Sequence, residues 1–428
     1  MAATCCTELG KKYFCCLNEA FITDPEIDEV DVIPCLDCYG KQNKETENPI
    51  VLVNHKLGIK SSCLRPLFLF AYEKLLGRRR ERKRDYSLSV TETVQLSRAV
   101  LLVNAECYTV WNIRKELISA GILSLEDDIK FSALVLSKHP RSAETFAHRR
   151  WTIGQLEKHK GQNEFVHCCL RSELAISLRA AESYADNYTA WSHRSWLVER
   201  FMKDMKKRLF CELQVMRKWT ERHISDNCGF HHKQVLLKYL KNVCSNSEVI
   251  HLLLSELEFT SDLILTFPGH EVVWYHRRFV YYFWNQFCTA GTSLGTLQEV
   301  SGSLKIGDDN SSENCNRTSR SPSSTIPSLF DLASASFNLL RELKFGFNSW
   351  TSVTKELTND RFVPLSTPSE LRFCNDVITR CQSEVQRRCA SNYKQWLLLQ
   401  SKYSANDCNV ARSSSGEAAT ESWQEMFV

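Results

Sequence analysis

The feature that most constrains this chain is a short motif, in which an aromatic residue, any residue, a histidine and a basic residue follow one another, and which recurs along the sequence. Successive copies begin roughly 35 to 45 residues apart, a period that is typical of solenoid proteins. In such proteins each repeat is one supersecondary unit that stacks on its neighbours. The motif residues are Phe146, His148 and Arg149; Trp191, His193 and Arg194; Phe230, His232 and Lys233; and Trp274, His276 and Arg277, with Trp111 and Arg114 in a partial copy and Trp396 in a degenerate one.

The content of one unit predicts a helical hairpin. Aromatic, basic and aliphatic residues share one stripe of a helix at the copy that contains Trp191, namely Tyr188, Trp191, Arg194 and Val198. We expect the rings to fill the space between helix layers and the guanidinium to lie against an aromatic face or to reach a loop carbonyl of the next repeat. The amphipathic runs 170–184 and 249–265 can supply partner helices. Two helices of about 15 residues with two short loops account for the period.

Composition supports helix throughout. Only 15 residues are Gly and 10 are Pro among 428, and no alternating run of β-branched residues between Gly-rich turns is apparent. We therefore predict an all-α fold.

Charge and cysteine usage exclude several classes of function. Lys and Arg (54) nearly balance Asp and Glu (50), so global electrostatics give no reason to expect a nucleic acid or an acidic membrane as partner. Several of the 19 cysteines are adjacent in sequence, which is poorly suited to a disulfide framework and indicates reduced, mostly buried thiols. No basic-then-apolar start and no apolar run of roughly 18 residues is apparent, so we expect no membrane span and a cytoplasmic protein.

The chain is predicted to have five parts. They are an N-terminal segment (1–86), the helical repeats (87–288), a disordered Ser-rich linker (289–328), C-terminal helices with the degenerate last repeat (329–403) and a disordered tail (404–428). Within the first part we expect one strand-like run at 50–53 and an apolar helix at 64–76. The basic run 78–84 is interpreted as a solvated helix end, with nuclear import or phosphate binding as the alternative.

Two groups of residues suggest a metal site, and we interpret both as structural. The four motif histidines lie one repeat apart, whereas ligands of one zinc ion must converge within a few ångströms, so we expect them to bridge helix layers. Cys35 and Cys38, with His55 and Cys63, nominally complete a zinc set, but their spacing is irregular and buried thiols are favoured. Phosphate-binding glycine loops are absent from the sequence, which indicates no self-sufficient active site.

The segments 187–196 and 140–151 resemble the repeat of the protein prenyltransferase α subunits, whose pattern is Pro-x-Asn-Tyr-x-x-Trp-x-His-Arg. The resemblance covers about residues 87–288 and 370–403. It is stronger to a divergent, repeat-containing member of that family than to the α subunits of farnesyltransferase or Rab geranylgeranyltransferase. Ala143 and Phe146 depart from it, because they replace the family's Tyr and Trp.

The resemblance implies an α-α superhelix, a right-handed crescent of helical hairpins that wraps a β subunit. The β subunit would carry the zinc and the lipid pocket, so we expect this chain to bind no cofactor. The family's leaving-group lysine corresponds to Arg141, which becomes the candidate catalytic residue. Asn187 and Tyr188 are candidates for the substrate rim, although capping by Asn187 and packing by Tyr188 fit equally well.

Two classes of function remain open. The first is the α subunit of a heterodimeric protein prenyltransferase that transfers geranylgeranyl from its diphosphate to a C-terminal cysteine of a protein substrate. The second is a non-catalytic helical-repeat scaffold for protein–protein interaction. The sequence does not name the β subunit or the protein substrate.

Overall fold

The computed structural model describes residues 2–34, 49–77, 89–162, 165, 169–291 and 366–410, with only the backbone for 2–6, 288–291 and 403–410. The described residues form two compact units, one up to Cys211 and one from Glu212 onward. This boundary falls within the predicted repeat block. A repeat array can divide there because each hairpin contacts mainly its neighbours.

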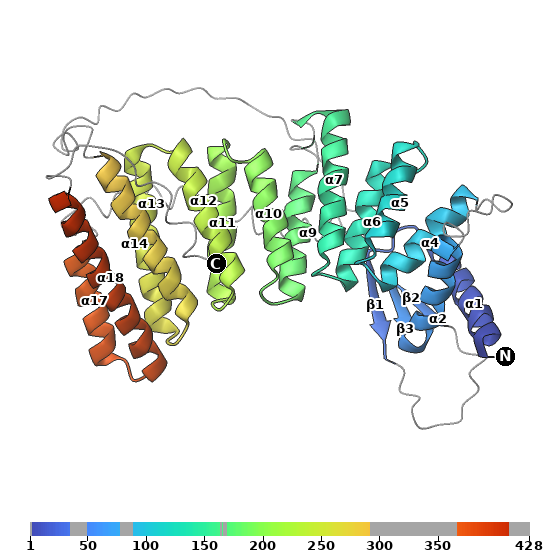
Figure 1. Cartoon of the computed structure of the whole chain (residues 1–428), viewed down its shortest axis with the longest axis horizontal. Coiled ribbons are helices and arrows are strands. Elements are labelled where there is room, and N and C mark those ends of the chain that lie inside the picture. Colours follow the sequence, from blue (N-terminus) through green and yellow to red (C-terminus); the bar gives the residue numbers. More distant parts are fainter. Residues whose placement is uncertain are drawn as a thin grey trace, which may run out of the picture. The chain divides into compact units, whose positions relative to one another are not determined.

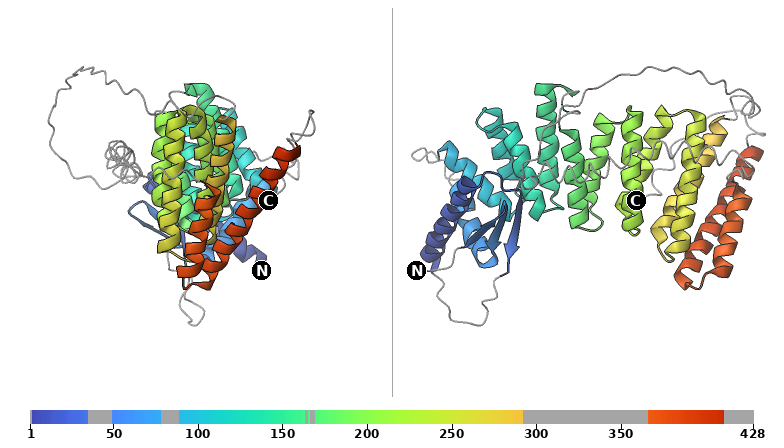
Figure 2. Two further views of the ribbon diagram at one scale, coloured as in Figure 1. Left: turned by 90° about the vertical axis from the view of Figure 1, so that its left-hand side faces the viewer. Right: turned by 180° about the vertical axis from the view of Figure 1, so that it is seen from behind.

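The first unit opens with a small α/β module (Figures 1 and 2). Helix α1 (Ala2–Thr23) packs on α2 (Ser61–Tyr72), and a three-stranded sheet in the order β1-β3-β2 lies beside them. β1 (Glu29–Ile33) runs parallel to β3 (Lys56–Lys60), and β2 (Ile50–Val53) runs antiparallel to β3. The strand predicted at 50–53 is β2.

The helix predicted at 64–76 corresponds to α2 and a π-helical turn, η1 (Glu73–Gly77). Strands β1 and β3 were not foreseen, because both runs are short and are interrupted, β1 by Asp31 and β3 by Gly58. Their buried residues, among them Val30 and Leu57, join one hydrophobic core with the first repeat helices.

This module is attached to the first hairpins by polar contacts as well as by that core. The Val30 amide donates to Ser137 Oγ over 3.0 Å, and Lys138 Nζ lies 2.6 Å from Asp31 Oδ1. Terminal caps of this kind cover the apolar end that an open repeat array would otherwise expose.

Helical hairpins follow in the first unit. They pair α4 (Val90–Val103) with α5 (Tyr108–Ser119), α6 (Leu125–Lys138) with α7 (Ala143–Lys160), and α9 (Leu170–Ser183) with α10 (Tyr188–Phe201). Polar caps set the helix starts, since Ser124, Ser142 and Asn187 each accept a hydrogen bond from a backbone N–H of the first turn. The amphipathic run predicted at 170–184 is α9.

Helix α11 (Lys206–Arg222) contains the boundary between the units, and the second unit continues with further helices. They are α12 (Asn227–Val243), α13 (Asn246–Thr266), α14 (Glu271–Gly291), α17 (Thr367–Arg380) and α18 (Glu384–Val410). A capping box at Ser245 and Glu248 starts α13. The linker predicted at 289–328 lies outside the described residues apart from 289–291, which belong to α14. Residues 329–365 of the predicted C-terminal helices also lie outside them.

The predicted all-α class of helical hairpin repeats is confirmed, with the small sheet as an addition. Among the described helices, none is long and apolar enough to cross a lipid bilayer. Among the cysteines whose side chains are described, only Cys63, Cys374 and Cys389 are buried, so for these residues the expectation of mostly buried thiols was wrong. The other described cysteines are at least partly exposed, and several of them lie at helix ends.

Candidate functional site

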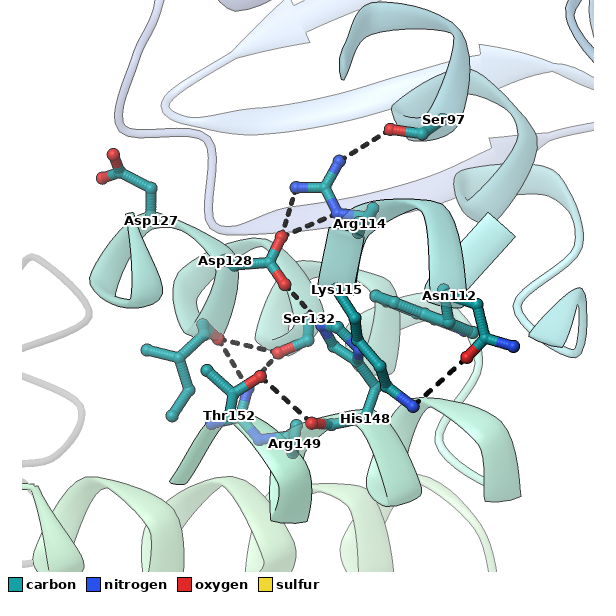
Figure 3. A network of polar contacts seen from close by, with 12 residues as sticks. Ser97, Asn112, Arg114, Lys115, Asp127, Asp128, Ser132, His148, Arg149 and Thr152 are labelled. Carbon is teal, nitrogen blue, oxygen red and sulfur yellow. Dashed lines mark hydrogen bonds and ion pairs between the residues drawn. The ribbon is translucent and has the colours of Figure 1, made fainter. Parts of the chain in front are cut away.

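A buried polar cluster joins the first two hairpins (Figure 3). Arg114 of α5 donates through Nε to Asp128 Oδ1 over 2.7 Å and through Nη1 to Ser97 Oγ over 2.9 Å. The other carboxylate oxygen of Asp128 contacts His148 Nε2 of α7. One acid on the first helix of a hairpin thus binds the basic residue of the preceding hairpin and the histidine of its own.

The next pair of hairpins repeats this arrangement. Arg149 of α7 donates through Nε to Glu173 Oε2 over 3.2 Å and through Nη1 to Ser132 Oγ over 2.8 Å. His193 Nε2 lies 3.5 Å from Glu173 Oε2. Equivalent residues therefore take equivalent places, and all of these side chains are buried.

The second unit contains further clusters of the same kind. Glu256 Oε2 lies 2.8 Å from Lys233 Nζ and 3.0 Å from His276 Nε2, and Glu212 lies 3.1 Å from His232. In the last cluster, Arg277 donates twice to Glu370 over 2.8 Å, and Tyr393 takes the place of the histidine, donating to Glu370 over 2.9 Å.

Three of the motif's basic residues also lie against aromatic rings, as the sequence led us to expect, but each ring belongs to the following hairpin. The Arg114 guanidinium lies 4.2 Å from the Phe131 ring centroid, Lys233 Nζ lies 3.8 Å from that of Phe259, and Arg277 lies 4.1 Å from that of Phe373. The aromatic residue three positions before each basic residue packs elsewhere. Trp111, for example, stacks on His148 with ring centroids 4.4 Å apart.

Burial and pairing fix the charge states in these clusters. Burial raises the pKa of the Asp128 carboxyl, but Arg114 and His148 lower it by more, so its pKa lies below the ordinary value. The same balance lowers the pKa of Glu173, and lowers that of Glu256 to about 2. Burial lowers the pKa of His148 although its acidic partner opposes this. The stable state at neutral pH is an ionised carboxylate beside a neutral imidazole.

The pKa values of His193 and His276 are lowered for the same reason, with burial as the largest cause. Nδ1 of His148 and Nδ1 of His276 are buried without a hydrogen-bond partner among the described atoms. A neutral ring with its proton on Nε2 satisfies this geometry, because the bare Nδ1 then needs no acceptor.

The motif histidines therefore connect the two helix layers, since each lies on the second helix of a hairpin and binds an acid on the first. Each of His148, His193, His232 and His276 contacts the acid of its own hairpin. The acids Asp128, Glu212 and Glu256 were missed by the sequence analysis. Their one signal is constant spacing, since each lies 20 residues before its histidine.

Two of the four residues that nominally complete a zinc set, His55 and Cys63, are described, and they have different structural roles. His55 is exposed and its Nδ1 lies 2.9 Å from Asp24, a hydrogen bond that raises the pKa of His55. Cys63 is buried in the N-terminal core. Cys35 and Cys38 lie outside the described residues.

A cavity of about 570 Å³ lies at the turns of the first hairpins. The turn between α4 and α5 and the turn between α6 and α7 line it, together with one residue that follows α9. The lining includes one cation, Arg141, one acid, Glu106, and the aromatic ring of Tyr184. Of these three residues, Arg141 was predicted from the sequence, whereas Glu106 and Tyr184 were not.

Arg141 is exposed yet held on several sides. Its Nη1 donates to the Tyr184 hydroxyl over 2.8 Å, and its guanidinium lies 4.4 Å from the Tyr184 ring centroid. Thr189 Oγ1 donates to the Arg141 carbonyl over 3.2 Å, and Asn187 Nδ2 donates to the Pro140 carbonyl over 2.7 Å. The following hairpin thus fixes both the backbone and the side chain of this arginine.

The two candidate rim residues differ in exposure. Asn187 is 1% exposed, and its side chain caps α10, accepts from Thr189 and donates to Pro140 and Ala180, which favours the capping interpretation. Tyr188 is 73% exposed and so does not share the buried stripe of Trp191. Tyr188 is the first residue of α10 and follows the N-cap residue Asn187. It is accessible to a partner or substrate.

The fold and these clusters define a class, namely an α-helical repeat protein whose hairpins are joined by buried ion pairs. A family model described as the protein prenyltransferase alpha subunit repeat matches residues 125–156, 170–201, 209–240 and 253–284. The chain is 32% identical over 428 residues to protein prenyltransferase alpha subunit repeat-containing protein 1 of Danio rerio, covering 89% of this chain and 94% of that one. The corresponding protein of Homo sapiens is 30% identical over 431 residues, covering 90% and 96%.

The chain therefore belongs to the protein prenyltransferase alpha subunit repeat family, as its sequence predicted. A more distant similarity extends to the geranylgeranyl transferase type-2 subunit alpha of Sus scrofa, at 22% identity over 202 residues. That similarity covers 44% of this chain and 33% of the relative. The stronger resemblance to the repeat-containing members is confirmed.

Proposed function

We propose that this chain is the α subunit of a heterodimeric protein prenyltransferase that transfers geranylgeranyl from its diphosphate to a C-terminal cysteine of a protein substrate. The β subunit would supply the lipid pocket and the zinc, and this chain would act in the cytoplasm. The single observation that carries the proposal is the exposed, pre-positioned Arg141 beside a cavity at the hairpin turns.

The chemistry of the reaction explains why that observation matters. The cysteine sulfur forms a bond to the allylic carbon while the bond from that carbon to the diphosphate oxygen breaks. Both electrons of the broken bond leave with the diphosphate, so negative charge grows on its oxygens. A fixed cation near those oxygens lowers the barrier, because it needs no reorganisation during the step. Arg141 would serve as that cation.

Two further features support an α subunit. The geranylgeranyl transferase type-2 subunit alpha of Sus scrofa is similar to 44% of this chain, at 22% identity. Tyr188 and Tyr108 are both largely exposed at the starts of second helices, which leaves aromatic side chains available to a partner. Exposed aromatic side chains are common at protein interfaces.

The test measures single-turnover transfer by this chain in complex with a β-type chain. Arg141→Ala should raise the barrier by about 1–3 kcal/mol, the range of a charged hydrogen bond, and should leave complex yield unchanged. Trp191→Ala is the contrasting variant. It removes a buried ring, should cost about 3–5 kcal/mol of stability and should lower complex yield. Equal transfer rates for Arg141→Ala and the parent would remove Arg141 from the mechanism.

The alternative is a non-catalytic scaffold for protein–protein interaction. The relatives that match nearly the whole chain carry names that describe their repeats and state no activity, which favours it. Absence of transfer by the parent chain with every β-type chain tested would support this alternative. Copurification of such a β chain supports the prenyltransferase proposal.

A further inference from the structure

We infer that Tyr184 is a positioning residue for Arg141, which it holds in the orientation that meets the diphosphate. The benefit of that orientation for catalysis rests on the proposed function. Whether Tyr184 orients Arg141 can be tested separately. Tyr184 does not touch the reacting atoms in this proposal. It acts only through the arginine.

Tyr184 restrains the guanidinium in two ways. It follows α9 as the C-cap residue, and its ring centroid lies 4.4 Å from the guanidinium carbon, so the ring limits the movement of that group on one side. Its hydroxyl accepts from Nη1 over 2.8 Å, which holds one end of the guanidinium in place. An arginine on a turn would otherwise sample many rotamers and present its donors to a ligand only part of the time.

The same hairpin also holds the backbone of the turn. Asn187 Nδ2 donates to the Pro140 carbonyl, and Thr189 Oγ1 donates to the Arg141 carbonyl. The backbone atoms from which the arginine side chain extends are therefore anchored to the start of α10. A residue supported at both its backbone and its side chain has the rigid setting that an electrostatic group needs.

The guanidinium remains available to a ligand. Only Nη1 of its three nitrogens donates a hydrogen bond within the part of the chain that the structure describes. Nε and Nη2 can thus meet two oxygens of one phosphoryl group, the fork geometry that arginine uses for phosphates. Glu106 lines the same cavity, so a mobile guanidinium would have an acid as a competing partner.

A purely structural role for Tyr184 predicts a different outcome. Tyr184 is 43% exposed and lies at a helix end, so truncating it should cost no more than about 1 kcal/mol of stability, well below the cost of removing a buried ring. Any loss in Tyr184→Ala should then appear in the transfer step and in the order of Arg141, and heat stability should be retained.

The experiment compares Tyr184→Phe, which keeps the ring, with Tyr184→Ala, which removes both restraints. Tyr275→Phe is the matched control, because Tyr275 is 51% exposed and its hydroxyl binds the side chain of Glu271. Single-turnover transfer should fall about 3-fold in Tyr184→Phe, about 10-fold in Tyr184→Ala and not at all in the control. Adding Tyr184→Ala to Arg141→Ala should cause no further loss.

The second readout needs no activity. In the full-length chain, the NMR order parameter of the Arg141 Nε–Hε group should be high in the parent and in Tyr275→Phe, and lower in Tyr184→Ala. An unchanged order parameter in Tyr184→Ala overturns the inference, as does a further loss of transfer in the double variant. If the parent transfers no prenyl group, the proposed function fails, and the order parameter still decides whether Tyr184 positions Arg141.

Discussion

Arg141 and Arg149 lie close together in sequence but in opposite environments. Arg149 is fully buried and paired with Glu173, and equivalent residues recur in other hairpins as Arg114 and Arg277. Arg141 is exposed on a turn and held by a tyrosine. The comparison shows that the repeated residues of this chain build the scaffold, and that the candidate functional residue is one that departs from the repeat.

The position of Arg141 can be compared with the equivalent position in the turns of the other hairpins. Each second helix has an N-cap residue, and the residue just before that cap is Glu106, Arg141, Asp186 or Ser225 in successive hairpins. Capping constrains the N-cap itself at Ser142, Asn187 and Asp226, whose side chains each accept from the helix start. The preceding residue carries no such duty, so its charge can change without loss of the fold.

Among the variants that test this comparison, Arg149→Ala is expected to cause the largest loss in the free energy of unfolding. It leaves the Glu173 carboxylate buried beside His193 with no cation, and loss of one partner of a buried pair costs about 3–5 kcal/mol. Urea denaturation measures the change. Arg200→Ala is the matched control, because Arg200 binds Glu157 at an exposed site and should cost at most about 1 kcal/mol. Equal losses in the two variants would contradict the structural role of the cluster.

Acid should weaken the same clusters. The pKa values of His148 and His276 are lowered on folding, so the unfolded chain takes up these protons first as the pH falls. The contribution of the neutral histidines is complete above about pH 6.5 and declines below it. The lowered pKa values of Asp128 and Glu256 add a second loss below about pH 4.

Thermal unfolding at constant ionic strength measures this dependence. The midpoint should fall from pH 7.5 to pH 5.5, and it should fall less in His276→Asn, which lacks one of the titrating rings. A midpoint that stays constant or rises over this range would show that the buried histidines do not remain neutral in the folded chain.

The sequence predicted the hairpins and the motif residues because both depend on local periodicity. It missed Asp128 and Glu256, since an isolated acid on an amphipathic helix looks like any solvent-facing charge until its partners are placed beside it. It placed Tyr188 in the buried stripe by helical spacing alone, although the first turn of a helix need not lie between layers. Tyr184 was missed for a related reason, because its partner Arg141 lies in the turn of the preceding hairpin.

The smallest change in the free energy of unfolding is expected for substitutions of the exposed residues at the hairpin turns. Arg141→Ala and Tyr188→Ala should each change the free energy of unfolding by no more than about 0.5 kcal/mol, because neither removes a buried contact. Urea denaturation of the chain, beside Arg149→Ala, measures this difference directly. A loss of several kcal/mol in Arg141→Ala would mean that its contacts with Tyr184 hold the hairpins together. The turn would then belong to the scaffold, and the contrast between a repeated interior and a functional edge would no longer hold.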